Sequence, residues 1–392
     1  MFDQNPSRLN TRSVKWDEAP TDVLPLWVAD MDFATAPCVQ AAIVRRAQHP
    51  CYGYTLVPDE YYQAIIQWFW QRHQWHIHRQ EILYTIGVVP AIAAILRAVC
   101  QTGDHVVMLD PVYNCFYSCV RNAGPTASMS PLTVSTTSDG QMHYSIDWDD
   151  LGQRLADDRA TVLLLCNPHN PVGRLWTEQE LSRIATLCER HHVMVISDEI
   201  HCELTAPGTA YTPFATVLTS QHQGLLYAVC TSPSKAFNIA GLQNANIIVP
   251  DTELRRRIDR AINLNETCDV NPFGVEAVIA AYRNGAGWLD DLRQYIWSNY
   301  EAARTYLGRE LPALRIADLQ ATYLLWIDYS PLSDMPSHRL SSRLRDEARV
   351  WFNEGIAYGA AGEHHLRINL ATSRATLLEA LKRFTSWSKI NF

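Results

Sequence analysis

The sequence predicts an α/β protein whose large domain has a mostly parallel central sheet flanked by helices. Short apolar runs alternate with longer stretches in which apolar residues recur at helical spacing, and polar or glycine-containing segments follow the runs. With 392 residues, of which 47% are hydrophobic and 19% are charged, the chain can form two domains and bury a sizeable core without metals or disulfides.

Five apolar runs in the middle of the chain predict buried strands at 105–109, 161–166, 193–197, 225–230 and 246–249. Between them, apolar residues at helical spacing predict helices at 90–100 and 178–191. Strands that alternate with helices favour a parallel sheet that is covered on both faces.

The pattern changes from about residue 288 onward. A helical stretch at 289–307, an apolar run at 323–327, a strand at 366–370 and a closing helix at 373–387 predict a smaller α+β domain. The N-terminal residues have too little periodicity to fold alone. We therefore predict three parts, which are a segment that packs with the small domain (1–45), a large domain (46–287) and the small C-terminal domain (288–392).

Charge and cysteine usage argue against several classes of protein. The 33 Lys and Arg against 41 Asp and Glu give a net charge of −8, which disfavours a nucleic-acid or anionic-membrane partner. The ten cysteines are scattered without a CxxC pair, so we expect reduced thiols and no metal site. The polar start lacks an apolar signal region, and no uncharged apolar run approaches the about 18 residues of a membrane span, so the expectation is a cytoplasmic protein.

Lysine is rare in this chain. Only four lysines occur among the 33 basic residues, and three of them (Lys15, Lys382 and Lys389) lie near a terminus. Lys235 is the one lysine in the body of the sequence.

Polar segments follow three of the predicted strands. The sequence NPHNPVG (167–173) follows the strand at 161–166, DEIH (198–201) follows the strand at 193–197, and TSPSK (231–235) follows the strand at 225–230. The segment TIGVV (85–89) precedes the helix at 90–100. Because ligands bind beyond the carboxyl ends of strands in open α/β sheets, we expect these segments to meet at one edge.

Each of these features alone has an ordinary structural explanation. Asp198 could cap a helix, Gly87 could serve a turn, and Lys235 could be a solvated surface charge. Together, however, they supply what pyridoxal 5′-phosphate requires, which is an amine, an acid for the pyridine nitrogen, an anion cradle for the phosphate and a flat partner for the ring.

The residues divide these roles according to their chemistry. Lys235 can hold the cofactor through an imine and then move protons, and Asp198 can pair with the protonated ring nitrogen. The free N–H groups of the helix that opens at 87–89 suit a phosphate, as does the Ser232 hydroxyl. Arg367, in the predicted strand at 366–370, can bind a substrate carboxylate with two hydrogen bonds.

The motifs NPHNPVG, SDEIH and SPSKAFNIAGLQ, in this order and spacing, resemble the fold-type I, aspartate-aminotransferase-like PLP enzymes. More narrowly, the chain resembles the cystathionine β-lyase or C–S lyase branch known as MalY/PatB. The segments LWVADMDFATAP (26–37), YGYTLVPDE (52–60) and GVVPAIAAI (87–95) are also typical of that branch. The similarity extends over essentially the whole chain.

The resemblance implies roles for individual residues. Lys235 matches the lysine that binds the cofactor, and Asp198 matches the partner of the pyridine nitrogen. Asn170 and His201 match residues that hydrogen-bond the phenolic oxygen, and Tyr113 matches the aromatic residue that stacks on the ring.

The resemblance also implies phosphate contacts from Gly87, Val88, Val89 and Ser232. Tyr54 matches a tyrosine that reaches the phosphate of the neighbouring subunit, which implies a homodimer with shared sites. Arg367 matches the residue that binds the carboxylate of a small amino-acid substrate.

Two positions depart from the family pattern. Gln243 stands eight residues after the lysine, where typical aminotransferases have an arginine, and this favours the lyase branch. After Arg367 the sequence is NLATSRATL, whereas close relatives more often have Cys-Pro before Arg-Ser.

The expected activity is β-elimination from L-cystathionine or a related cysteine S-conjugate, which yields pyruvate, ammonia and a thiol. A class I/II aminotransferase with the same cofactor is the alternative, and a PLP-retaining regulatory protein is a third hypothesis.

Overall fold

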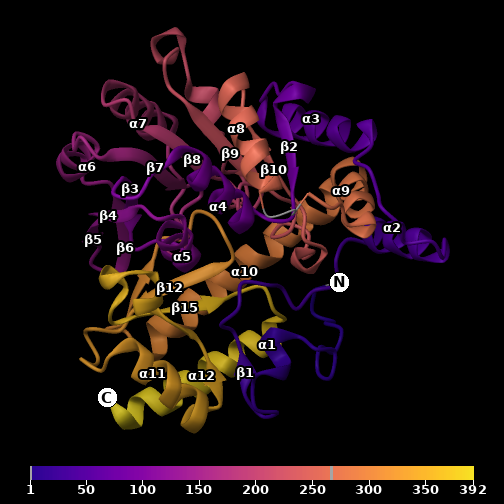
Figure 1. Cartoon of the computed structure of the whole chain (residues 1–392). Helices are drawn as coiled ribbons and strands as arrows, with labels where there is room; N and C mark the ends of the chain where they lie inside the picture. The colour runs from indigo at the N-terminus through magenta and orange to yellow at the C-terminus, as the bar shows by residue number, and fades with distance from the viewer. Residues whose placement is uncertain (1, 265–267) are drawn as a thin grey trace.

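The computed structural model describes residues 2–264 and 268–392 and has two lobes (Figure 1). The large lobe is built on a seven-stranded sheet in which only β10 runs antiparallel to its neighbours. In spatial order the strands are β2 (Ile82–Thr85), β10 (Ala245–Ile248), β9 (Tyr227–Thr231), β8 (Met194–Asp198), β7 (Ala160–Cys166), β3 (His105–Asp110) and β4 (Thr126–Pro131).

Both faces of this sheet are buried, because the apolar runs of the sequence place side chains alternately on each face. In β7, Val162 and Leu164 pack on one face, and Leu163 and Leu165 pack on the other. The first face is covered by α4 (Val88–Val99), α5 (Asn114–Ala123) and α8 (Thr252–Asn263). The second face is covered by α6 (Trp148–Leu155) and α7 (Glu178–Arg190).

The small lobe contains a six-stranded sheet. Its strands, in spatial order, are β14 (Asn353–Glu354), β15 (His365–Asn369), β12 (Leu324–Asp328), β11 (Arg315–Ala317), β6 (Gln141–Ser145) and β5 (Thr133–Thr136). The core beside this sheet includes side chains of α10 (Ala286–Glu310), α11 (Ser337–Arg343) and α12 (Arg374–Asn391). Strands β5 and β6 come from the middle of the chain, so the sheet of the small lobe also includes residues that precede 288.

The N-terminal residues contact both lobes. After α1 (Val14–Asp17), β1 (Leu24–Pro25) pairs with β13 (Val350–Trp351) in the small lobe. In contrast, α2 (Pro37–Gln48) and α3 (Asp59–His73) pack on α9 (Pro272–Asn284) in the large lobe. The division of the chain into three parts at residues 45 and 287 stays a prediction. In the structure, β1 contacts the small lobe and α2 contacts the large lobe.

The α/β fold predicted from the apolar runs is confirmed. Each predicted strand lies within two residues of an observed strand at both ends, and the four predicted helices correspond to α4, α7, α10 and α12. Within the described ranges, no helix has the length and apolarity needed to span a bilayer.

The lobes meet at Gly359, which follows a short helical turn of the small lobe and has φ +118°. A Cβ at this position would overlap Asp110 Oδ1 and the Tyr117 hydroxyl. These two groups are already hydrogen-bonded to each other at 3.0 Å, and Asp110 Oδ2 accepts a hydrogen bond from Ala361 N at 3.2 Å.

The substitution Gly359→Ala should therefore lower the free energy of unfolding by about 3 kcal/mol, because it adds both backbone strain and overpacking. Urea denaturation of the purified protein measures this change. Gly308→Ala is the control, because a Cβ on this α10 residue meets nothing within 4 Å and should be neutral or stabilise by about 0.5–1 kcal/mol. Equal midpoints for the wild type and Gly359→Ala would contradict the close approach.

Candidate active site

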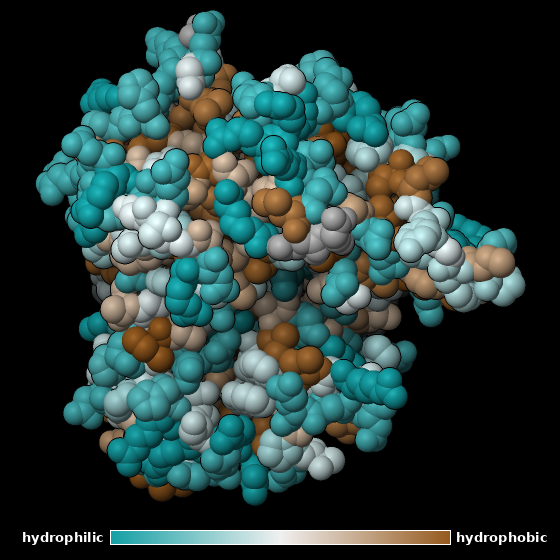
Figure 2. Space-filling model, viewed as in Figure 1, coloured by the Kyte–Doolittle hydropathy of each residue, from teal (hydrophilic) through white to brown (hydrophobic). Residues whose placement is uncertain are grey.

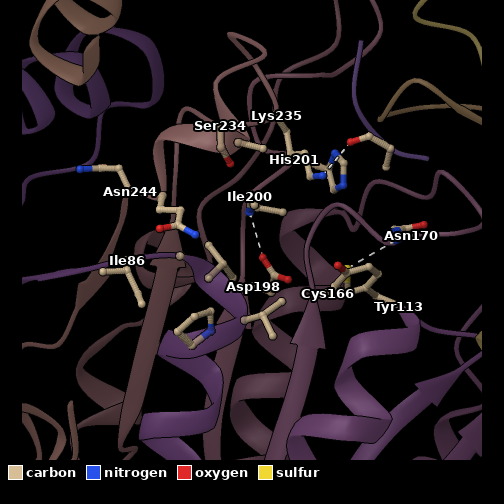
Figure 3. A pocket seen from close by; sticks show the side chains of 17 residues that line it. Ile86, Tyr113, Cys166, Asn170, Asp198, Ile200, His201, Ser234, Lys235 and Asn244 are labelled. Carbon is tan, nitrogen blue, oxygen red and sulfur yellow. Dashed lines mark hydrogen bonds between the residues drawn. The ribbon is translucent and has the colours of Figure 1, made fainter. Parts of the chain in front are cut away.

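A cavity of about 200 Å³ lies at the carboxyl edge of the parallel strands, where the topology of an open α/β sheet places ligands (Figure 3). The segments predicted to converge do so in this structure. The predicted site residues that line the cavity are Gly87, Val88, Val89, Tyr113, Asn170, Asp198, His201 and Lys235. They come from the start of α4, the N-cap of α5, the end of β8 and the loops after β7, β8 and β9.

Lys235 lies in the loop after β9, and its Nζ donates a hydrogen bond to Ala29 O at 2.7 Å (Figure 3). Burial, together with the positive charge of Arg367, lowers the pKa of Lys235 to about 8, although Asp30 and Asp198 oppose this shift. A lysine with such a pKa is partly neutral at physiological pH. It can therefore act as a nucleophile and as a proton acceptor.

Asp198 is the last residue of β8, and its side chain is buried. Oδ1 accepts a hydrogen bond from Ile200 N at 3.1 Å. Burial raises the pKa of Asp198 to about 7, against the opposing effects of this hydrogen bond and of Lys235. A cation beside the carboxylate would restore its charged form, and a protonated pyridine nitrogen is such a cation. Asp198 therefore fits the predicted cofactor.

His201 and Asn170 bring hydrogen-bonding groups to the same cavity. Burial, followed by the positive charges of Lys235 and Arg367, lowers the pKa of His201 well below its usual value, so the imidazole is neutral. Its Nδ1 is buried and has no hydrogen-bond partner within the described chain. Such an orphaned atom fits a polar ligand. Asn170 Oδ1 accepts a hydrogen bond from Arg367 Nη1 at 3.3 Å.

Arg367 lies on β15 of the small lobe and does not line the cavity itself. Its guanidinium is buried, lies 4.8 Å from the centre of the Tyr358 ring and donates a hydrogen bond to Trp27 O at 3.0 Å. Nε is buried without a partner among the described residues. This unused donor, next to Asn170, fits a guanidinium that is oriented for a carboxylate.

The phosphate end of the cavity is formed by the start of α4. Gly87 occupies the N-cap position without a side-chain cap, and the next residues, Val88 and Val89, line the cavity. The uncapped N–H groups and the positive end of the helix dipole suit an anion. Gln243, at the position where typical aminotransferases have an arginine, also lines the cavity.

Ser232 does not line this cavity. Its hydroxyl donates to Asn244 O at 2.6 Å and accepts a hydrogen bond from Ser234 N at 3.1 Å. The serine that lines the cavity is Ser234, which belongs to the same SPSK motif but was not predicted as a site residue. A phosphate contact from Ser232 therefore stays a prediction.

The two predicted tyrosines differ in their surroundings. Tyr113 lines the cavity at the N-cap of α5, and burial raises the pKa of its phenol well above the ordinary value. Tyr54 lies in the segment between α2 and α3, is 98% exposed and does not line the cavity of its own chain. A phosphate contact from Tyr54 therefore requires a second subunit.

Sequence reasoning missed the contact between Lys235 and Ala29, which are 206 positions apart, and the contact between Asn170 and Arg367, which are 197 positions apart. For Ala29 a signal was available, because it belongs to the branch-typical segment LWVADMDFATAP, to which no role was assigned. Cys166, Ile200 and Asn244 also line the cavity without having been predicted.

Residues 21–384 match the family model of aminotransferase class I and II. The chain therefore belongs to this family, as its motifs predicted. It is similar to cystathionine beta-lyase PatB of Bacillus subtilis, with 39% identity over 97% of this chain and 98% of the relative. It is also similar to protein MalY of Escherichia coli, with 33% identity over 96% and 95% of the two chains.

Solved structures show the same fold. Cystalysin from Treponema denticola, which contains a pyridoxal 5′-phosphate cofactor, matches with a TM-score of 0.94 and 30% identity over 100% of this chain and 99% of that chain. The PLP-bound C–S lyase from Staphylococcus hominis matches with a TM-score of 0.91 and 29% identity over 100% of both chains. The predicted fold-type I architecture is thus confirmed.

The pKa of Lys235 gives a direct test of the site. In the cofactor-free protein, acetylation of Lys235 should rise with a midpoint near pH 8, because only the neutral amine reacts and burial lowers its pKa to about 8. Peptide mass spectrometry after brief acetic anhydride pulses, from about pH 6 to about pH 10, measures the midpoint. In urea the midpoint should move up toward the ordinary lysine value of about 10.4. Identical midpoints in folded and unfolded protein would contradict the lowered pKa of Lys235.

Proposed function

We propose that this chain is a pyridoxal 5′-phosphate-dependent C–S lyase that cleaves L-cystathionine or a related cysteine S-conjugate. The products are pyruvate, ammonia and a thiol. The observation that carries the proposal is the 39% identity with cystathionine beta-lyase PatB over nearly the whole of both chains. The cavity that brings Lys235 and Asp198 together, and the likeness to the Staphylococcus hominis C–S lyase, support it further.

The chain's own residues would hold the cofactor at its functional groups. Asp198 would bind the protonated ring nitrogen, and the Asn170 amide N–H and the His201 imidazole would hydrogen-bond the phenolic oxygen. The α4 N-terminus at Val88 and Val89 would hold the phosphate. When bound, pyridoxal 5′-phosphate supplies a ring that takes up the negative charge developing at the substrate Cα.

Lys235 moves the protons of the reaction. Its neutral amine accepts the proton from the substrate Cα, which its pKa of about 8 permits near neutral pH. The Cβ–S bond then breaks, and the sulfur leaves with a proton as the free thiol. The remaining three-carbon unit takes up one water molecule and ends as pyruvate and ammonia, so atoms balance without an oxidant or a second substrate.

Arg367 orients the substrate through its carboxylate. The hydrogen bonds to Asn170 Oδ1 and Trp27 O, and the Tyr358 ring, fix the guanidinium plane before a substrate arrives. Such preorganisation reduces the entropy lost on binding. Gln243, in place of an arginine at the cavity, supports the lyase over the aminotransferase.

The proposal is tested by incubating the purified enzyme, loaded with pyridoxal 5′-phosphate, with L-cystathionine and no keto acid. We expect pyruvate and thiol in equal amounts, measured by coupling to lactate dehydrogenase and by a thiol reagent. Lys235→Ala is the control and should release neither product, because the proton carrier is gone.

Two outcomes would contradict the proposal. Turnover that starts only after a keto acid is added would identify an aminotransferase. The absence of pyruvate and thiol across a panel of cysteine S-conjugates would exclude a C–S lyase.

We further infer a homodimer in which Tyr54 completes the neighbouring site. Tyr54 is 98% exposed, and Tyr52 and Leu56 beside it are also exposed. The adjoining helix α2 stands out from the body of the molecule (Figure 1, Figure 2). Exposed aromatic and aliphatic side chains that gather on one projecting segment are typical of a protein interface.

Mixing two inactive variants tests the shared site. Lys235→Ala and Tyr54→Ala homodimers should each be strongly impaired, whereas mixed dimers should regain activity, because one of their two sites then has both native residues. The assay is pyruvate release after the two variants are refolded together. If Tyr54 acted within its own chain, mixing would restore nothing.

We also propose a reducing compartment such as the cytoplasm. All ten cysteines are free thiols in the structure, and five of them are buried. Titration of ten thiols per chain in denaturant without reductant is the expected result, and a lower number would contradict it.

A further inference from the structure

The main chain of residues 27–32 contacts both cations of the candidate site. Ala29 O accepts hydrogen bonds from Lys235 Nζ at 2.7 Å and from Tyr323 OH at 2.9 Å. Trp27 O accepts a hydrogen bond from Arg367 Nη2 at 3.0 Å. The position of this segment therefore decides where the Lys235 amine is held when it is not bonded to cofactor.

The segment is fixed by different contacts at its two ends and in its middle, where Asn369 Nδ2 donates to Val28 O and to Asp30 O, each at 2.6 Å. At the Trp27 end, strand β1 pairs with β13, and Asn369 N donates to Leu26 O at 2.9 Å. At the other end, Asn238 donates to Met31 O at 3.0 Å and to Phe33 O at 2.8 Å. Asn238 stands only three residues after Lys235, so this contact joins the segment to the loop that carries the lysine.

Asp32 is the buried centre of a charged cluster at the second end. Its Oδ1 accepts hydrogen bonds from Trp16 Nε1 at 2.8 Å, Lys15 Nζ at 3.0 Å and Arg8 Nη1 at 3.2 Å. Lys15 is fully buried, and Arg8 also binds Asp30 at 2.6 Å. None of these four charged residues lines the cavity.

Net stabilisation of the fold is a weak explanation for such a cluster. Removing a lysine and an aspartate from water costs free energy that their attraction roughly repays, whereas the directional hydrogen bonds define one geometry. The geometry defined here is that of the segment whose carbonyl group meets Lys235.

We propose that Asp32 is a positioning residue for Lys235, because Lys15, Arg8 and Trp16 hold it so that the 27–32 segment presents Ala29 O to the lysine amine. This inference rests on the proposed function, in which Lys235 moves the protons. A carbonyl acceptor orients the amine and favours its charged form. Without it, the amine is less well aimed at the substrate and more open to reagents from solvent.

The test uses Asp32→Asn in the full chain, with the Lys235 acetylation assay on cofactor-free protein as the main measurement. We expect the acetylation rate near pH 7 to rise about threefold or more and the midpoint to fall, because the acceptor for the ammonium form is displaced. In the loaded enzyme we expect kcat to fall about tenfold while KM changes by less than about threefold, because the separately fixed Trp27 end still holds Arg367.

The variant substitutes none of the titratable and charged groups that face Lys235, and Arg8 keeps its ion pair with Asp30, so a change in the pKa of Lys235 reports a movement of the 27–32 segment. The groups that face Lys235 are Arg367, Asp30, Asp198, Cys115, His201 and Tyr323. Asp32→Asn leaves Lys15 buried without a charged partner, which can unfold the protein. The double variant Lys15→Met/Asp32→Asn removes both charges, and the same changes in acetylation and kcat are expected from it.

Glu203→Gln is a matched control. Glu203 is another buried carboxylate that accepts hydrogen bonds from a tryptophan, a histidine and an arginine, namely Trp68 at 2.6 Å, His73 at 2.6 Å and Arg72 at 2.8 Å. It does not line the cavity, and its hydrogen bonds do not reach the 27–32 segment. This variant should lower the thermal midpoint but leave Lys235 acetylation and its pH midpoint as in the wild type.

Two results would overturn the inference. One is wild-type acetylation of Lys235 in both Asp32 variants, and the other is an equal change in Glu203→Gln, which would show general loosening. The acetylation assay needs no turnover. If the wild type cleaved neither L-cystathionine nor any other cysteine S-conjugate of the panel while Asp32→Asn changed acetylation as expected, the proposed function would be wrong and the positioning of Lys235 would stand.

Discussion

Removal of charge from water at the carboxyl edge of the seven-stranded sheet is the constraint on which this site depends. Burial lowers the pKa of Lys235 to about 8 and raises that of Asp198 to about 7, so both groups change charge close to neutral pH. A lysine and an aspartate on the surface would both be fully charged at neutral pH, so a bound cofactor would not change the protonation state of either. Burial at the edge of the sheet therefore allows Lys235 and Asp198 to gain or lose a proton near neutral pH.

The site also depends on how the two lobes meet. Asn170 belongs to the large lobe and Arg367 to the small lobe, and one hydrogen bond joins them. Tyr358 O holds its loop against the large lobe, because it accepts hydrogen bonds from Val112 N, just after β3, and from Tyr117 OH on α5. The hydrogen bond between Arg367 and Asn170 thus links the residue that would orient the substrate to a residue that would bind the cofactor.

Sequence patterns predicted the helices and strands that are determined by the residues within each element. Apolar runs indicated the strands, because burial on both faces requires continuous apolar residues, and the strand ends located Asp198 and Lys235. Contacts between distant segments leave no such pattern. Neither the pairing of β5 and β6 with the small-lobe sheet nor the contact of Ala29 with Lys235 could be predicted from spacing. Ser234, rather than Ser232, lines the cavity because of loop geometry that periodicity does not describe.

The distribution of lysines affects which amines of the protein can react with the free cofactor in a cell. Pyridoxal 5′-phosphate is an aldehyde and condenses with any accessible primary amine. Lys15 is fully buried and ion-paired, which leaves Lys382 and Lys389 on the closing helix as the exposed lysines. An arginine-rich surface offers the same positive charge without this reactivity. Few lysine amines of this chain therefore compete with Lys235 for the aldehyde.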